Sequence, residues 1–187
     1  ELSQKINAAV KPWKAQPLVP GAAAFGTTVK VTNPADRREA LGEYLAASEA
    51  NVQQALANAV KAQPGWDALP AASRAVILEK AADLLEARMP EFMAMCVKEA
   101  GKSLSASVAE VREAVDFLRY YAGQARELFA PVKLPGPTGE SNQLSLHGRG
   151  VFVCISPWNF PLAIYLGQVA AALAAGNSVI AKPAAQT

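Results

Sequence analysis

The chain has 187 residues, of which 51% are hydrophobic and 18% are charged, and its formal net charge is +2. This balance is typical of a globular domain and excludes an intrinsically disordered chain. No lysine and arginine cluster forms a basic stripe, so nucleic-acid binding has no electrostatic support. The longest apolar stretch, 161–175, is interrupted by Gly167 and Gln168 and is too short and mixed to cross a bilayer.

The first 26 residues show little periodicity and contain Pro12, Pro17, Pro20 and Gly21. Such a composition predicts a linker or an extended arm laid on another surface. The chain begins without an initiator methionine and without a signal peptide, which suggests an excised module. We therefore expect an arm over 1–26 and one domain over 27–187.

The domain begins with two predicted strands. Residues 27–32 alternate in the manner of a strand and end at the turn signal Asn33-Pro34. Residues 40–46 are expected to form a second strand paired with the first, although alanine and glutamate weaken that pattern.

Helical patterns dominate the middle of the chain. Ser48 is expected to cap a helix that ends before Pro64, and Ser73 to cap a second helix. Pro90 suits the first turn of a third helix, which Gly101 closes. The apolar faces expected to be buried are Val52, Ala55, Leu56, Ala59 and Val60 in the first helix, and Val76, Ile77, Ala81, Leu84 and Leu85 in the second.

A longer apolar stripe predicts a fourth helix over 104–129. A coiled coil and a long helix packed on a globular core are both compatible with this stripe. It covers fewer than four heptads, which favours the packed helix. The stripe consists of Leu104, Val108, Val111, Val115 and Leu118, and continues through Ala122 and Ala125 to Phe129.

The last part of the chain reads as strand, helix, strand. After a proline- and glycine-rich connection over 131–141, residues 143–146 alternate. The continuous apolar run 151–155 predicts a parallel strand covered on both faces. A helix rich in small residues over 162–175 and a strand over 178–181 complete an α/β crossover unit.

Polar side chains follow each of these two strands. Asn159 lies between Pro157 and Pro161, which restrict the backbone around it. Its amide could donate to a developing oxyanion, or it could cap the following helix. Lys182 leaves the second strand and could reach ribose or phosphate, or remain an ordinary solvated lysine. In an open parallel sheet, ligands bind outside these carboxyl ends.

The remaining reactive residues give weaker signals. Cys96 and Cys154 stand in apolar surroundings and are expected to be free buried thiols, and no zinc spacing exists. His147 has no partner pattern and is expected to face solvent or fill a strand end. No glycine-rich phosphate loop of the G-x-G-x-x-G or Walker type is present.

The motifs Pro157-Trp-Asn-Phe-Pro161, Ala174-Ala-Gly-Asn177 and Lys182-Pro-Ala184 together resemble the aldehyde dehydrogenase superfamily. The resemblance covers nearly everything after about residue 27 and includes Asn33-Pro-Ala35 and Glu99-Ala-Gly-Lys102. The segments 151–164 and 110–122 are most similar to the branch that oxidises L-glutamate-γ-semialdehyde in proline catabolism, fused to a proline dehydrogenase. The implied fold is α/β: an N-terminal helical portion plus the first β-α-β unit of a Rossmann-like NAD-binding domain, truncated.

The resemblance also implies site roles. Asn159 matches the family's oxyanion-hole asparagine. Ile155, Ser156, Pro157 and Trp158 match the segment that lines the cofactor pocket. Lys182 matches the lysine that bonds the adenosine ribose, and Ala184 and Ala185 follow it in the same cofactor-binding stretch. No metal site is implied.

One departure from the family concerns Ala185, where the family often places a glutamate that bonds the adenosine ribose. Loss of this carboxylate should weaken NAD binding. It also removes a charge that would repel a 2′-phosphate, so tolerance of NADP is a hypothesis.

The family oxidises an aldehyde through a cysteine thiohemiacetal, transfers hydride to the nicotinamide cofactor, and hydrolyses the thioester with a glutamate base. That cysteine and glutamate are expected beyond Thr187, so the segment alone is predicted to be inactive. FAD would belong only to a proline dehydrogenase domain elsewhere in the parent. The parent is expected to be a cytoplasmic homo-oligomer that takes a small aldehyde, with no nucleic-acid or membrane contact through this segment.

Two other functions share this scaffold: a reductase of acyl phosphates or acyl-CoA, and an inactive assembly module. Of the other residues, Glu99 and Lys102 are expected to be solvated at a helix end, although Glu99 could face an aldehyde channel. Phe117, Tyr120 and Tyr121 are expected to be mostly core.

Overall fold

The computed structural model describes the backbone of residues 1–187 and every side chain except that of Leu2. Helices account for most of the regular structure, as the apolar periodicity predicts. The helices are α1 (Leu2–Ala9), α2 (Glu49–Asp67), α3 (Ala71–Ala87), α4 (Met89–Glu99), α5 (Leu104–Leu128) and α6 (Ala163–Ala174).

The strands form three separate small sheets. The first has the order β1-β3-β2, in which β3 pairs parallel to β1 and antiparallel to β2. An antiparallel hairpin joins β4 to β5, and β6 pairs parallel to β7. The strands are β1 (Trp13–Ala15), β2 (Thr28–Thr32), β3 (Ala40–Leu45), β4 (Val132–Leu134), β5 (Asn142–Leu144), β6 (Val151–Ile155) and β7 (Ser178–Lys182).

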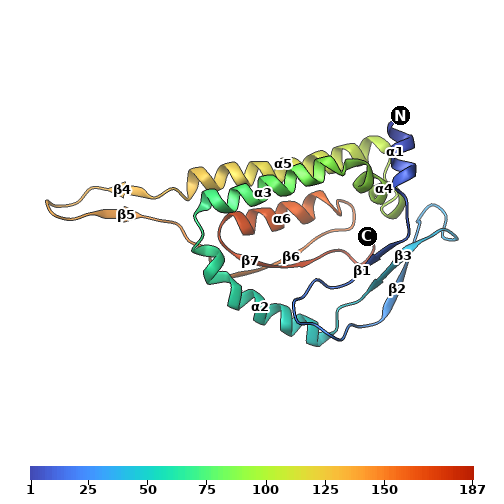
Figure 1. Ribbon diagram of the computed structural model, residues 1–187, viewed down its shortest axis with the longest axis horizontal. Helices are drawn as coiled ribbons and strands as arrows, with labels where there is room; N and C mark the ends of the chain where they lie inside the picture. Colours follow the sequence, from blue (N-terminus) through green and yellow to red (C-terminus); the bar gives the residue numbers. More distant parts are fainter.

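The elements are arranged in layers around α6. Figure 1 shows α3 and α5 side by side above α6, the pair β6–β7 beneath it, and α2 beneath the pair. The sheet β1–β3 lies at the end that holds the N-terminus, and the hairpin β4–β5 extends from the opposite end. The crossover β6–α6–β7 is therefore held between helices.

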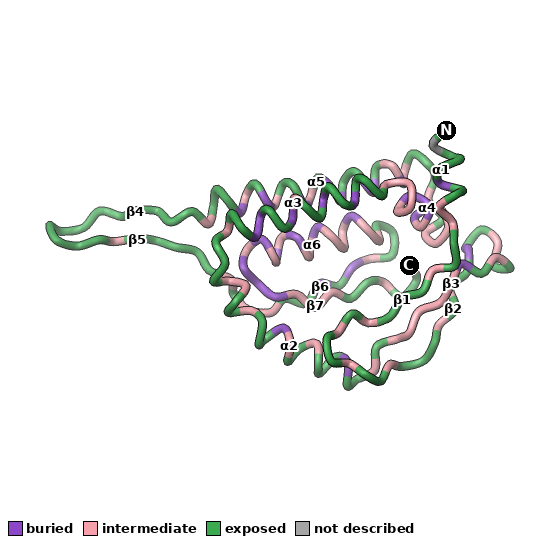
Figure 2. The backbone as a smooth tube through the Cα atoms, in the orientation of Figure 1, coloured by how far each residue is buried: buried purple, intermediate pink, exposed green. Residues whose placement is uncertain are grey.

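The core lies where α3, α5 and α6 meet, and Figure 2 shows the buried positions concentrated there. Many of its side chains are alanines, which let the helix backbones approach closely. One such close contact is at Gly167 of α6, where an added Cβ would lie 3.0 Å from the ring of Phe117 on α5. The fully buried members are Ala75, Ala82, Met93, Ala94, Ala114, Ala122, Ala163 and Ala170.

Most predicted elements are confirmed. Ser48 caps α2 in a reciprocal capping box with Asn51. Pro90 stands in the first turn of α4, and Gly101 follows its end with a left-handed φ of 65°. The long apolar stripe forms α5, packed on the core rather than in a coiled coil. Cys96 and Cys154 are both free and buried.

Several boundaries differ from the prediction. Helix α2 continues through Pro64 to Asp67, and α3 begins after Pro70 rather than with Ser73 as its cap. The connection 131–141 contributes strand β4. Pro64 therefore stands inside α2 near its C-terminal end, where a proline removes one helical hydrogen bond without ending the helix.

The first 26 residues contain a helix and a strand that their sequence does not predict. Helix α1 has only 8 residues, and its Ile6 is 3% exposed within the main core. So short a helix is formed by its packing rather than by its own periodicity. Strand β1 then joins the sheet beside β3. The placement of the domain boundary at residue 26 stays a prediction.

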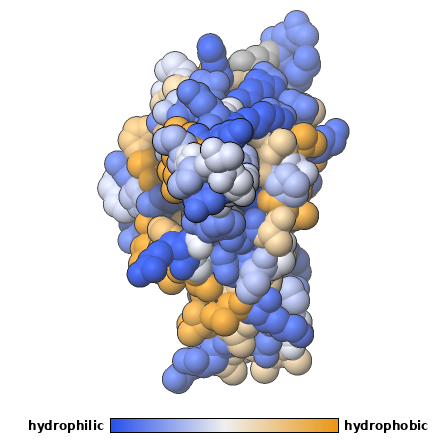
Figure 3. Space-filling view, turned by 90° about the vertical axis from the view of Figure 1, so that its left-hand side faces the viewer, coloured by the Kyte–Doolittle hydropathy of each residue, from blue (hydrophilic) through white to orange (hydrophobic). Residues whose placement is uncertain are grey.

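Helices α2 and α3 bury the expected faces only in part: Ala59 and Leu85 are buried as predicted, but most of the other predicted positions are not. In α3 the buried residues include Ala75, Leu78 and Ala82, whereas Val76 and Ile77 are exposed. Both stripes satisfy helical spacing, and close packing against α5 selects the one with smaller side chains. The predicted α2 face is largely exposed at Val52, Leu56 and Val60. Figure 3, which views the hairpin end, shows hydrophobic side chains on the surface at the level of α2.

The prediction that β6 is covered on both faces is also wrong. Phe152, Val153 and Ile155 are 44%, 59% and 62% exposed, and within this strand only Cys154 is buried. The physical reason is that β6 is an edge strand of a two-stranded sheet, and the flanking helices α2 and α6 pack more on β7 than on β6.

Candidate functional site

The parallel pairing of β6 and β7 brings two predicted site segments to one edge of the sheet. Ile155, the last residue of β6, is in register with Lys182, the last residue of β7. The pairing continues one step further, because the backbone N–H of Ser156 donates to the carbonyl oxygen of Lys182 over 3.2 Å. Residues 156–161 and 183–185 therefore leave the sheet side by side.

The side chains at this edge differ sharply in exposure. Ile155 is 62% and Trp158 is 59% exposed, so both offer apolar surface. Ser156 is buried, and its hydroxyl has no hydrogen-bond partner among the side chains and backbone that the structure describes. Such an orphan group fits a site whose partner is supplied by a ligand.

Lys182 is exposed, and its ammonium group donates to the carbonyl oxygen of Pro183 over 2.9 Å. Of the two residues that follow Pro183, Ala184 is half-buried and Ala185 is exposed. A flexible cation beside exposed apolar side chains suits a ligand with both phosphate and aromatic parts. The residues present thus fit a dinucleotide.

Asn159 is exposed on the loop between β6 and α6, and it does not cap the helix. The residue at the cap position is Leu162, with helical φ and ψ and no side-chain capping bond. Among the described residues, no hydrogen bond uses the side-chain amide of Asn159. The alternative that this asparagine is a helix cap is therefore wrong, and its amide is free to meet a ligand.

The group that does cap α6 was missed by sequence reasoning. Glu110 of α5 is 1% exposed, and its Oε1 accepts from the backbone N–H groups of Leu162 and Ala163, each over 3.0 Å. Its other oxygen lies 2.7 Å from the Nζ of Lys102. A carboxylate is favoured at a helix N-terminus by the unpaired N–H groups and the helix dipole.

Lys102 and Glu99 are less solvated than expected. The Lys102 side chain is only 13% exposed, which contradicts the prediction of a solvated lysine, because the ion pair with Glu110 draws it inward. Glu99 is half-buried, and burial raises the pKa of its carboxyl group. Of the aromatic residues, Phe117 and Tyr121 pack against the core, whereas Tyr120 is 59% exposed.

Neither cysteine of the chain is an activated nucleophile. Burial, with a further contribution from the charge of Glu110, raises the pKa of the Cys96 thiol to about 12. Burial also raises the pKa of Cys154, which lies inside strand β6. A reactive cysteine needs a lowered pKa and access to its substrate.

The single histidine lies outside this edge. His147 is exposed, as expected, but it does have a partner: its Nδ1 lies 3.1 Å from Oδ2 of Asp67. The other carboxylate oxygen of Asp67 accepts from the backbone N–H of Gly148 over 2.7 Å. Burial alone would raise the pKa of Asp67, but these two partners outweigh it and lower the pKa. Through these two contacts, Asp67 holds the chain that enters β6 against the C-terminal end of α2.

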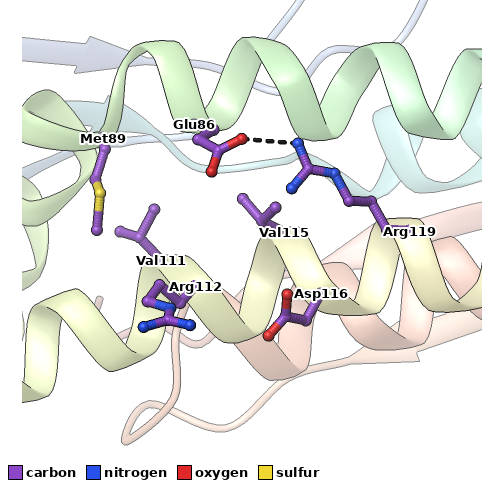
Figure 4. Close-up of a pocket in the computed structure, with 7 residues that line it drawn as sticks. All are labelled: Glu86, Met89, Val111, Arg112, Val115, Asp116 and Arg119. Carbon is purple, nitrogen blue, oxygen red and sulfur yellow. Dashed lines mark hydrogen bonds and ion pairs between the residues drawn. The ribbon is translucent and has the colours of Figure 1, made fainter.

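A small cavity of about 150 Å³ lies elsewhere, between α3 and α5 (Figure 4). Arg119 closes one side of it through a contact of 2.7 Å to Glu86. None of the predicted site residues lines it. Its lining residues are Glu86, Met89, Val111, Arg112, Val115, Asp116 and Arg119.

Two other kinds of site find no support. Among the described side chains, no cluster of histidine, cysteine, aspartate or glutamate has the arrangement of a metal site. In the part of the chain that the structure describes, no helix is long and apolar enough to cross a membrane.

Known proteins share both the sequence and the arrangement of these elements. The model of the aldehyde dehydrogenase family matches residues 21–187. The bifunctional protein PutA of Klebsiella aerogenes is 50% identical over 185 residues, which cover 99% of this chain and 13% of that protein.

Two solved structures extend the comparison. Proline utilization A from Bdellovibrio bacteriovorus, inactivated by N-propargylglycine, is 33% identical with a TM-score of 0.91, over 99% of this chain and 20% of that one. The 1-pyrroline-5-carboxylate dehydrogenase from Thermus with bound NAD is 35% identical with a TM-score of 0.88, over 98% of this chain and 36% of that one. This chain thus spans a minor part of each relative, and it belongs to the aldehyde dehydrogenase family.

Proposed function

We propose that this segment is part of an NAD-dependent aldehyde dehydrogenase that oxidises L-glutamate-γ-semialdehyde to glutamate. The observation that carries the proposal is the free amide of Asn159 on the loop after β6, beside the edge that also holds Lys182. The names of the relatives, PutA and 1-pyrroline-5-carboxylate dehydrogenase, support this substrate.

In this proposal the chain supplies binding and electrostatic groups. Bound NAD would accept the hydride. Lys182 would hold the adenosine ribose, while Ile155, Ser156, Pro157 and Trp158 would line the cofactor pocket. The amide of Asn159 would donate to the aldehyde oxygen as negative charge develops on it. We place the nucleophilic cysteine and the glutamate base outside residues 1–187, and FAD in a separate proline dehydrogenase domain of a homo-oligomeric parent.

The test uses the full-length protein that contains this segment, with the semialdehyde as substrate and NADH absorbance as readout. We expect Asn159→Ala to lower kcat by about 10²–10³-fold, the effect of losing one oxyanion donor, with NAD affinity nearly unchanged. Asn7→Ala, at an exposed asparagine of α1, is the matched control and should retain full activity.

Three results would contradict the proposal in different ways. Full activity in Asn159→Ala would remove the oxyanion role. Absence of turnover with any small aldehyde, despite bound NAD, would favour the inactive assembly module. NADH oxidation with an acyl phosphate or acyl-CoA, but no NAD reduction with aldehydes, would favour the reductase.

The exposed Ala185 is expected to influence the preference of the enzyme for NAD over NADP. Ala185→Glu should restore a carboxylate acceptor for the ribose and repel a 2′-phosphate. A hydrogen bond to a charged group contributes about 1.5–3 kcal/mol, so the ratio of kcat/KM for NAD over NADP should rise by about tenfold or more. Ala185→Gln keeps the size without the charge. NADP turnover that is undetectable in the unmodified enzyme would contradict the hypothesis of NADP tolerance.

A further inference from the structure

Glu110 is an unusual residue for the middle of a core helix. It is 1% exposed on α5, and its neighbours on the buried face are small or apolar, such as Ser107, Val111 and Ala114. A buried carboxylate is stable only when its charge is paired and hydrogen-bonded. Its contacts therefore indicate what it holds in place.

Glu110 contacts the chain that follows Asn159 directly through one carboxylate oxygen and indirectly, through Lys102, with the other. Oε1 accepts the N–H groups of Leu162 and Ala163, the residues that start α6. Oε2 is paired with Lys102, whose Nζ lies 4.4 Å from the centre of the Phe160 ring. A cation over an aromatic face is attracted to it, and the more strongly when desolvated.

Two contacts thus hold the β6–α6 loop on the C-terminal side of Asn159. Phe160, the next residue, contacts Lys102, and residues 162 and 163 are bonded to Glu110. Pro161 between them restricts the backbone further. The amide of Asn159 itself has no hydrogen bond among the described residues, so its direction depends on these neighbours.

We infer that Glu110, with Lys102 as its counterion, is a positioning residue that sets the direction of the Asn159 amide. This inference rests on the proposed oxyanion role of Asn159. Neither side chain needs to touch the substrate: Glu110 fixes the start of α6, and Lys102 fixes Phe160. The expected signature is a loss of kcat that disappears when Asn159 is already absent.

The experiment is a double-mutant cycle in the full-length enzyme. We expect Glu110→Ala to lower kcat for the semialdehyde at least tenfold, whereas the Kd for NAD, measured by titration, stays within twofold. In the Asn159→Ala background, Glu110→Ala should change kcat by less than twofold. Glu127→Ala, at an exposed glutamate near the end of the same helix, is the matched control.

The conservative variants separate positioning from simple stability. Glu110→Gln keeps one acceptor oxygen for α6 but leaves Lys102 unpaired, so its kcat should lie between those of the unmodified enzyme and Glu110→Ala. Adding Lys102→Met should recover thermal stability relative to Glu110→Gln alone, because no buried charge is then left without a partner, but it should not recover kcat, because the contact of Lys102 with Phe160 is lost. If Glu110→Ala does not fold, the cycle is run with Glu110→Gln.

The outcomes distinguish this inference from the proposed function. If Asn159→Ala itself leaves kcat unchanged, the proposed function fails. If Asn159→Ala lowers kcat as expected but the Glu110 variants lower kcat equally in both backgrounds, or not at all, the positioning inference is wrong and the proposed function stands.

Discussion

At the scale of single residues, helix α6 is held at both ends by charges that complement its dipole. Glu110 accepts from its N-terminal N–H groups, and Arg74, 2% exposed, donates from Nε to the carbonyl oxygen of Ala174 over 3.2 Å. Anions are favoured at a helix N-terminus and cations at its C-terminus. Both charges come from other helices, so the crossover unit depends on the helical portion for its position.

Arg74 also connects three elements at once. Its Nη1 donates to the carbonyl oxygens of Asp67 and Leu69, and its guanidinium group lies 5.7 Å from the centre of the Phe129 ring. Burial lowers the pKa of the Arg74 guanidinium group, and the charge of Asp67 opposes this shift; an arginine side chain stays protonated in proteins.

We predict that Arg74→Leu destabilises the C-terminal end of α6. The substitution removes the donor to the carbonyl oxygens of Ala174, Asp67 and Leu69, of which the bond to Ala174 is buried, and a buried group left unsatisfied costs about 1–3 kcal/mol. Hydrogen exchange of the full-length protein, followed by mass spectrometry, should show faster exchange of amides over 170–178 and little change in α1. Arg74→Lys should recover only part of the protection, because a lysine lacks the planar fork.

Arg37→Leu is the matched control, since Arg37 is exposed in the turn between β2 and β3. Unchanged exchange over 170–178 in Arg74→Leu would mean that the other donors at this end hold the helix without Arg74: Trp66 Nε1 to Leu173, Gln63 to Gly176 and Asn177 to Ala172.

The sequence made some site residues predictable and others not. The positions of Asn159 and Lys182 after two apolar runs predicted that they would share one edge, and the strand register supports this for Lys182. Glu110 left only a weak signal, a charged residue within the buried side of a helical stripe. The residues of α6 whose N–H groups it accepts lie 52 and 53 positions away in the sequence, and no local pattern reveals contacts of that range.

At the scale of elements, helical periodicity and capping residues predicted which segments are helices. They also predicted the buried face of α5, but not those of α2 and α3. In α3, the stripes through Val76 and through Ala75 both fit a period of 3.6. The choice depends on how closely α5 and α6 approach, and that distance is set by tertiary packing. For the same reason α1 was missed, because Ile6 is its main anchor in the core.

For the strands, too, the sequence predicted the elements but not how far they are buried. Apolar runs predicted β6 and β7 and their parallel pairing correctly. The exposure of a strand depends on how many strands and helices flank it, which its own residues do not specify. The run 151–155 has the composition of a covered strand and lies here beside one partner.

At the scale of the whole molecule, strand β6 leaves apolar surface exposed to solvent near the candidate site. Side chains alternate along a strand, so Val153 and Ile155 share one face. They are 59% and 62% exposed, and Trp158 adds further apolar surface beside them. Adjacent exposed apolar side chains on an edge strand, such as β6 beside its one partner β7, favour association with another chain.

We therefore predict that the segment 1–187, produced by itself, self-associates through the Val153 face of β6. Sedimentation velocity at micromolar concentrations should show dimers or larger species. Val153→Lys should shift the distribution toward monomer, because a charge on this face cannot be buried without a partner. Thr32→Lys adds the same charge to an exposed position of β2 and should leave association unchanged. A monomeric segment, or equal effects of the two lysines, would mean that the β6 face does not drive association.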